Sequence, residues 1–105
     1  MYLARFSYDV LPVNRQRAIE FIRQEIETAQ ANGFRARLLV PLTRPHGAAA
    51  LQFEVELPSL DQFEDFRHQG AGSKQETGEW MHAFSEILIT PPAVDILRID
   101  ERPAT

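Results

Sequence analysis

The chain contains no cysteine among its 105 residues. This excludes disulfides, thiolate catalysis and cysteine-ligated zinc, and it is compatible with a reducing cytoplasm, where we expect the protein to reside. Cationic residues are also few, because eleven lysines and arginines are set against fifteen acidic residues, for a net charge of −4. Since no basic patch accumulates along the chain, we expect no nucleic-acid partner.

Long apolar runs are missing as well. No stretch approaches the roughly 20 residues of a membrane span, so we expect no membrane insertion. The first ten residues, MYLARFSYDV, alternate like a strand and have no signal-peptide apolar segment. The length predicts one domain over residues 1–100, followed by a loose tail at 101–105.

Regular alternation is the strongest pattern that the chain does contain. Apolar and polar residues alternate with a period of two in four segments, which predicts β-strands. These segments are 2–10, 34–43, 48–57 and 93–99.

Helical spacing fills the intervals between these segments. Apolar residues with a 3.6-residue period predict a helix from Pro12 to about Ala31, and Asn32-Gly33 is a typical stop. Two capping boxes, beginning at Ser59 and Ser73, predict a short helix to about residue 68 and a longer helix to about residue 88. The order β-α-β-β-α(α)-β predicts a ferredoxin-like α+β fold, with a four-stranded antiparallel sheet and its helices on one face.

The two faces of this sheet differ in chemistry. We expect the helices to pack on Phe6, Leu38, Phe53 and their neighbours. If Pro45 lies in a regular hairpin turn, the register also pairs Arg37 with Glu54 and Arg35 with Glu56 on the other face. That face would carry Arg5, Ser7, Arg35, Arg37, Leu39, Gln52, Glu54 and Glu56. Either it faces solvent, or it meets the sheet of a second copy and encloses a wet, well-paired space.

The element order and two segments, FEDFRHQGAGSKQETGEWMHAFSEIL and VDILRI, carry a family resemblance. The chain resembles the dimeric α/β-barrel superfamily, which includes antibiotic-biosynthesis monooxygenases, NIPSNAP-like proteins and stress-responsive barrel proteins. The resemblance implies a homodimer formed through the sheets and a pocket between the sheet and the helices of each protomer. It fixes a reaction only weakly, because one fold hosts many functions.

The cofactor-free monooxygenases of this superfamily oxidise polycyclic phenols with polar pocket residues, so the resemblance implies a candidate site. The catalytic candidates are Tyr8, Arg37, Trp80 and His82. The ligand-binding candidates are Arg5, Phe6, Phe53, Phe66 and Phe84, and Arg98 is also chemically suitable. Each has a structural alternative: the aromatic residues suit a core, and Arg5 and Arg37 suit partners for Glu54.

Histidine and metal chemistry receive less support. His82 lies about 200° from Trp80 on a helical wheel, which favours a surface position, and His46 and His68 suit a turn and a helix end. Some members of the superfamily hold haem with a histidine on a late helix, and they also use a polar residue on the first strand and a nearby tryptophan. His82, Ser7 and Trp80 are loose counterparts of these residues, and the spacing of the tryptophan and the histidine differs. No ligand pattern for a metal is present, so we expect neither a metal nor a cofactor.

We therefore predict a small-molecule enzyme or auxiliary protein of bacterial specialised metabolism. It would be a cofactor-independent oxygenase, cyclase or isomerase acting on an aromatic or polyketide-like compound. The alternative is a non-catalytic, NIPSNAP-like dimeric binding or scaffold protein, in which aromatic side chains would fill the space between sheet and helices.

Overall fold

The predicted α+β architecture is present. A computed structural model describes residues 1–43, 49–69 and 74–100, with side chains described outside 67–77. The elements are β1 (Tyr2–Tyr8), the 3-10 helix η1 (Pro12–Asn14), α1 (Arg15–Ala31), β2 (Arg35–Leu39), β3 (Leu51–Leu57), α2 (Leu60–Gln69), α3 (Lys74–Ser85) and β4 (Ala93–Arg98). All strand pairs are antiparallel and the strand order is β2-β3-β1-β4, the ferredoxin-like order.

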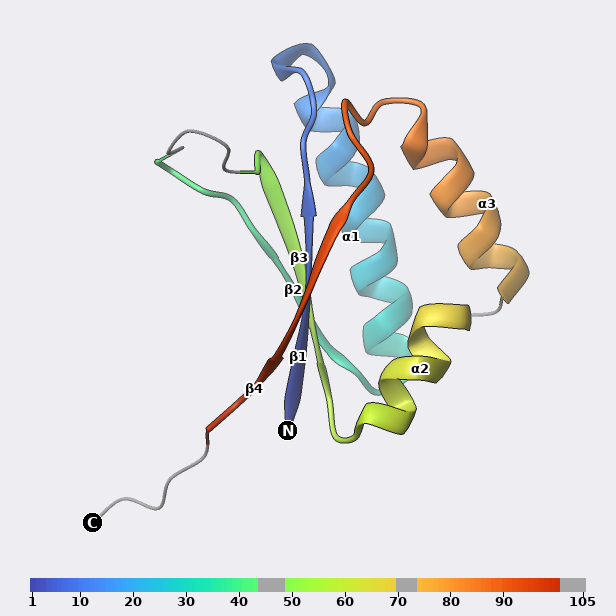
Figure 1. Cartoon of the computed structure of the whole chain (residues 1–105). Coiled ribbons are helices and arrows are strands. Elements are labelled where there is room, and N and C mark those ends of the chain that lie inside the picture. Colours follow the sequence, from blue (N-terminus) through green and yellow to red (C-terminus); the bar gives the residue numbers. More distant parts are fainter. Residues whose placement is uncertain (44–48, 70–73, 101–105) are drawn as a thin grey trace.

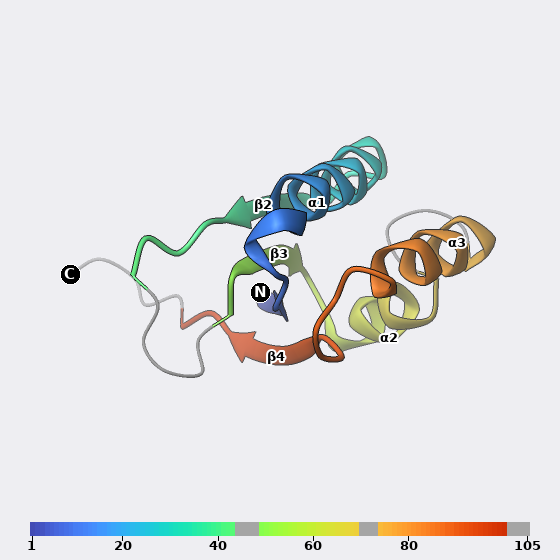
Figure 2. The same ribbon diagram turned by 90° about the horizontal axis from the view of Figure 1, so that it is seen from above.

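The helices of the described part of the chain cover one face of the sheet and leave the other without a helix. Figure 1 shows α1, α2 and α3 on the same side of the sheet, and the view from above in Figure 2 shows the opposite side without a helix. α1 contacts β2 and β3, while α2 contacts β3 and α3. Within the described ranges, no helix is both long enough and apolar enough to cross a membrane.

Helix α1 shows why the sequence forms these elements. Ala18, Ile22 and Ala29 are fully buried on one stripe of the helix, as the 3.6-residue spacing predicted. Gly33 ends the helix with a φ of 85°, a left-handed conformation that glycine adopts without a Cβ clash. The Gly33 N–H donates to the carbonyl of Gln30, and the N–H of Phe34 donates to that of Ala29, which is the Schellman motif.

The predicted boundaries of the helices after β3 are confirmed in part. The Ser59 hydroxyl accepts a hydrogen bond from the backbone N–H of Gln62 at 3.2 Å, as the first capping box predicts. The second capping box, the glycine break and the hairpin turn around Pro45 lie outside the described residues. α3 ends at Ser85, not near residue 88, and the Ser85 hydroxyl donates to the carbonyl of His82 at 2.7 Å, competing with the helical ladder.

Three strands are shorter than predicted. β2 stops at Leu39, before Pro41, which cannot donate to a strand ladder. β3 begins only at Leu51. β1 stops at Tyr8, after which Val10 forms an isolated bridge with Leu88.

The predicted register of β2 on β3 is confirmed over its described length. Arg37 lies opposite Glu54 and Arg35 lies opposite Glu56, and the ladder ends at the pair of Leu39 and Gln52. Pairing with β1 also places Arg5 opposite Glu54. Glu54 therefore lies between two arginines, at the centre of the face that no helix covers.

The hydrophobic core lies between the sheet and α1, with α3 at one end. Phe84 of α3 is fully buried and stacks on Tyr8 and Phe21, with ring centroids 4.8 and 5.2 Å apart. The ring of Trp80 meets Phe84 edge-on at 5.2 Å. This aromatic cluster fixes α3 against β1 and α1, and it forms one wall of the site described next.

Candidate functional site

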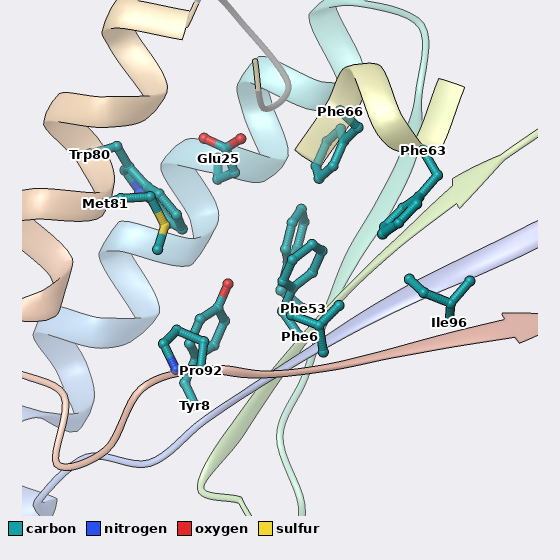
Figure 3. Close-up of a pocket in the computed structure, with 11 residues that line it drawn as sticks. Phe6, Tyr8, Glu25, Phe53, Phe63, Phe66, Trp80, Met81, Pro92 and Ile96 are labelled. Carbon is teal, nitrogen blue, oxygen red and sulfur yellow. The ribbon is translucent and has the colours of Figure 1, made fainter. Parts of the chain in front are cut away.

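A cavity of about 570 Å³ lies between the sheet and the three helices. This is within the size range of pockets that bind drug-sized molecules, roughly 300–1,000 Å³. Figure 3 shows the side chains around it, contributed by β1, β3, β4, α1, α2 and α3 and by the segment before β4. The lining residues are Phe6, Tyr8, Glu25, Phe53, Phe63, Phe66, Trp80, Met81, Pro92, Val94 and Ile96.

Aromatic rings form most of the wall. Phe6 stacks on Phe53 with centroids 5.6 Å apart, and Phe66 lies 6.0 Å from Phe6. Trp80 is fixed in place because its indole N–H donates a hydrogen bond to the carbonyl of Phe21 at 2.8 Å. Since that donor is already used, Trp80 presents ring surface to the cavity, where a flat aromatic molecule could stack.

Among the described residues that line the cavity, two have oxygen-bearing side chains, and these interrupt the apolar wall. Tyr8 on β1 and Glu25 on α1 are both buried, and the Glu25 residue is only 6% exposed. Figure 3 shows the Tyr8 hydroxyl pointing from the sheet toward the side of the pocket where Glu25 lies, between Trp80 and Phe66 in this view. Burial and, secondly, the nearby Glu25 carboxylate raise the pKa of Tyr8 far above its usual value. Tyr8 therefore remains a protonated hydrogen-bond donor at any physiological pH.

The two ends of the pocket differ in exposure. Tyr8, Phe53 and Phe66 are buried at the inner end. Met81, Val94 and Ile96 are large apolar residues that are exposed in the chain, so they form the rim. The pocket thus combines an apolar mouth with a polar inner end, which suits a molecule with an apolar body and one polar substituent.

Five of the predicted site residues come together in this pocket: Tyr8, Trp80, Phe6, Phe53 and Phe66. Phe84 does not line it, because its ring is fully buried behind Tyr8 and Trp80. Among the histidines, His82 is exposed on α3 and is not a lining residue. His46 and the side chain of His68 lie outside the described part of the chain.

The arginine candidates lie elsewhere. Arg5 and Arg37 project from the opposite face of the sheet, where the Nε of each donates to Glu54 at 2.8 Å. They follow the structural alternative considered for them, because alternation along a strand turns Arg5 away from Phe6. Arg98, near the end of β4, is exposed and does not line the pocket.

Glu25 is the charged lining residue that was not predicted from the sequence. Its signal was available, because Glu25 falls in register with Ala18, Ile22 and Ala29 on the buried stripe of α1. A carboxylate inside such a stripe is unusual, since burial of a charge is costly without compensating contacts. Met81, Pro92, Val94 and Ile96 were also missed. Their contribution depends on how β4 and α3 face each other across the pocket.

Metal ligation was not expected. Among the residues described, no group of three or more histidine and acidic side chains is close enough to hold a metal ion. Ser7 accepts a hydrogen bond from the Gln52 amide at 3.4 Å on the opposite face of the sheet, so it is not near Trp80 in the pocket.

Solved structures of other proteins have a similar fold. Rv0793 from Mycobacterium tuberculosis superposes with a TM-score of 0.70 at 15% identity, over 99% of this chain and 100% of that one. An antibiotic biosynthesis monooxygenase gives 0.72 at 12% identity, over 98% and 100%. Protein Atu4242 from Agrobacterium tumefaciens gives 0.59 at 16% identity, over 93% and 92%. No protein-family model and no curated protein sequence matches the chain. The chain therefore has the ferredoxin-like α+β fold found in antibiotic-biosynthesis-monooxygenase-like proteins.

Proposed function

We propose that this protein is a small-molecule enzyme or auxiliary protein of bacterial specialised metabolism. It acts without a cofactor, as an oxygenase, cyclase or isomerase, on an aromatic or polyketide-like compound. The observation that carries the proposal is the aromatic-lined cavity of about 570 Å³, whose described lining includes the oxygen-bearing side chains of Tyr8 and Glu25. One of the similar structures is an antibiotic biosynthesis monooxygenase, which supports the same class of chemistry.

The pocket can supply proton transfer without a bound group. The Tyr8 hydroxyl is held protonated and can donate a hydrogen bond to a carbonyl or developing oxyanion of the substrate. The Glu25 carboxylate can accept a proton from an acidic C–H or O–H group. In an oxygenase, molecular oxygen would be the co-substrate. In a cyclase or isomerase, the proton would return to the same molecule.

A non-catalytic scaffold is the less favoured alternative. In such a protein, Phe6, Tyr8, Phe53, Phe63, Phe66 and Trp80 would fill the space between sheet and helices. Here the same six side chains surround an open cavity. An open, aromatic-lined space favours a protein that binds a small molecule, since an apolar void without a ligand costs packing energy.

We also propose that the protein works as a homodimer through the uncovered face of its sheet. The Glu54 side chain is only 1% exposed even in the single chain, and Arg5 and Arg37 form ion pairs with its carboxylate. A second sheet placed on this face would therefore remove little water from the carboxylate, which lowers the desolvation cost of enclosure. Leu3 and Leu97 are paired across β1 and β4 on this face and offer apolar area for contact.

Sedimentation equilibrium at micromolar concentration should give twice the 12.0 kDa mass of the chain. The Leu97→Lys variant should shift the protein toward monomer, because it adds a charge to the proposed contact. Val13→Lys is the matched control, since Val13 is an exposed apolar residue of η1 away from the sheet, and it should leave the mass unchanged. A monomeric wild type would refute the dimer.

Turnover tests the enzymatic proposal. A panel of uncharged bicyclic and tricyclic phenols and ketones is incubated with the protein, with oxygen uptake and product mass as the two measurements. Tyr8→Phe should reduce the rate of any reaction found by about 100-fold, the usual cost of removing one donor to a developing oxyanion. Tyr2→Phe makes the same change on the same strand outside the pocket, and it should leave the rate unchanged. If Tyr8→Phe reacted at the wild-type rate, Tyr8 would have no role in the reaction.

A further inference from the structure

Met81 places a sulfur atom at the mouth of the pocket. The chain has no cysteine and two methionines, so its sulfur atoms are those of Met1 and Met81. Met81 belongs to α3, lines the cavity and is 37% exposed. Figure 3 shows its side chain extending from α3 on the side of the cavity. A small oxidant in solution can therefore reach this sulfur while the protein stays folded.

The packing of α3 does not require a thioether at this position. Phe84 and Trp80 hold the helix through their ring contacts, and Phe84 is fully buried. Met81 lies beside Trp80 in the sequence and contributes to the rim of the pocket. Because a change of polarity at an exposed side chain has little effect on stability, oxidation of Met81 would alter the pocket more than the fold.

The oxidation itself needs only a hydroperoxide as the second reactant. The Met81 sulfur attacks one oxygen of the O–O bond, a sulfur–oxygen bond forms, and the O–O bond breaks. The sulfur is oxidised by one electron pair, which reduces the departing oxygen. The proton of the transferred oxygen moves to the departing oxygen, so hydrogen peroxide leaves as water and an alkyl hydroperoxide leaves as an alcohol. The product is methionine sulfoxide, a polar side chain in place of an apolar one.

The rest of the rim has no hydrogen-bond donor for a sulfoxide oxygen. Val94 and Ile96, which form the rim with Met81, have apolar side chains, and the Trp80 N–H already donates to a backbone carbonyl. A sulfoxide oxygen held against an apolar ligand would lose its hydrogen bonds to water, which is costly. If the side chain turned out to solvent instead, the ligand would lose apolar contact area. Either response weakens the binding of an apolar molecule.

We propose that Met81 is an oxidation site that controls the pocket: a hydroperoxide converts its thioether to the sulfoxide, and the modified rim binds apolar ligands less tightly. The inference goes beyond the proposed function, because it makes the pocket responsive to peroxides. It rests on that function in one respect, since the pocket must bind an apolar molecule.

2-Naphthol serves as the probe. Its binding is followed through the indole N–H resonance of Trp80, which is unique because the chain has one tryptophan. Dilute hydrogen peroxide should add one oxygen atom to Met81 in the folded protein, as located by mass spectrometry of its peptides. The oxidised protein should bind 2-naphthol at least about tenfold more weakly than the untreated protein. Methionine sulfoxide reductases of both stereospecificities should restore the affinity.

Variants assign the effect to Met81. Met81→Leu removes the sulfur, and its affinity before and after peroxide should agree. Met1 remains in this variant, is 44% exposed and does not line the pocket, so its oxidation is an internal control. Met81→Gln places a polar group in the rim and should weaken binding without peroxide. Leu60→Gln makes a similar change at an exposed position of α2 outside the lining and should bind like the wild type.

The outcomes separate this inference from the proposed function, and thermal unfolding of each protein shows that it is folded. The inference is wrong if Met81 resists peroxide that oxidises Met1, or if its oxidation leaves the affinity for 2-naphthol unchanged. It is also wrong if Met81→Leu loses affinity after peroxide as the wild type does. In these cases the pocket still binds a small molecule. If the untreated wild type does not bind 2-naphthol, both the inference and the proposed pocket function fail.

Discussion

Replacing Glu54 with lysine is expected to lower the free energy of unfolding by about 3–5 kcal/mol, because it places an uncompensated cation at a buried position. The Glu54 side chain is 1% exposed, and it accepts hydrogen bonds from the Nε atoms of Arg5 and Arg37, each at 2.8 Å. These contacts join β1 and β2 through β3, which lies between them in the sheet. A lysine would remove the shared acceptor and add a third cation between two guanidinium groups.

Glu56→Lys provides a matched control on the same strand and the same face. A carboxylate oxygen of Glu56 lies 3.9 Å from the Nη1 atom of Arg35. The Arg35 side chain is 87% exposed, so the pair is solvated. We expect Glu56→Lys to change the free energy of unfolding by less than about 1 kcal/mol. Urea unfolding of both variants at one protein concentration measures the difference. Equal losses for the two variants would show that burial between two arginines gives Glu54 no special role.

The pairing of Glu54 shows how far the sequence could be interpreted. The predicted register put Arg37 opposite Glu54 because both segments alternate and lie close together in the sequence, so local information was sufficient. The second partner, Arg5, depends on β1 lying next to β3, which is a property of the whole topology. Strand ends were the weakest part, as Pro41 illustrates, since alternation continued past the residue that cannot pair.

The candidate site was predictable in its aromatic part and not in its polar part. Phe6, Phe53, Phe66, Tyr8 and Trp80 were expected at the pocket and line it. Their side chains face the helices by simple periodicity.

Polar residues are harder to place, because the same residue type serves structure or function. Arg37 was suited both to a substrate and to Glu54, and its position opposite Glu54 decided the geometry. Glu25 was visible as a charge on a buried helical stripe, yet only the packing of α1 over the sheet shows that it borders a cavity.

The distinction between packing and lining leads to the other large expected effect. Phe84→Ala should lower the free energy of unfolding by about 3–5 kcal/mol, because the side chain is fully buried and its removal leaves a void. Three rings would lose contact: those of Tyr8, Phe21 and Trp80. That loss is a large part of the roughly 5–15 kcal/mol that stabilises a domain.

Phe63→Ala separates this effect from the loss of any phenylalanine. Phe63 is half-buried and already borders the cavity, so its removal widens an existing space, and we expect a cost of about 1–2 kcal/mol. Binding of 2-naphthol should change in the opposite order. Phe84→Leu, which remains folded because most of the volume is kept, should bind it like the wild type, whereas Phe63→Ala should weaken it. Urea unfolding measures the free energy of unfolding, and the indole N–H resonance of Trp80 measures the binding of 2-naphthol. If Phe84→Leu weakened binding while Phe63→Ala left it unchanged, the ligand would lie in the aromatic cluster of α3 and not in the cavity beside it.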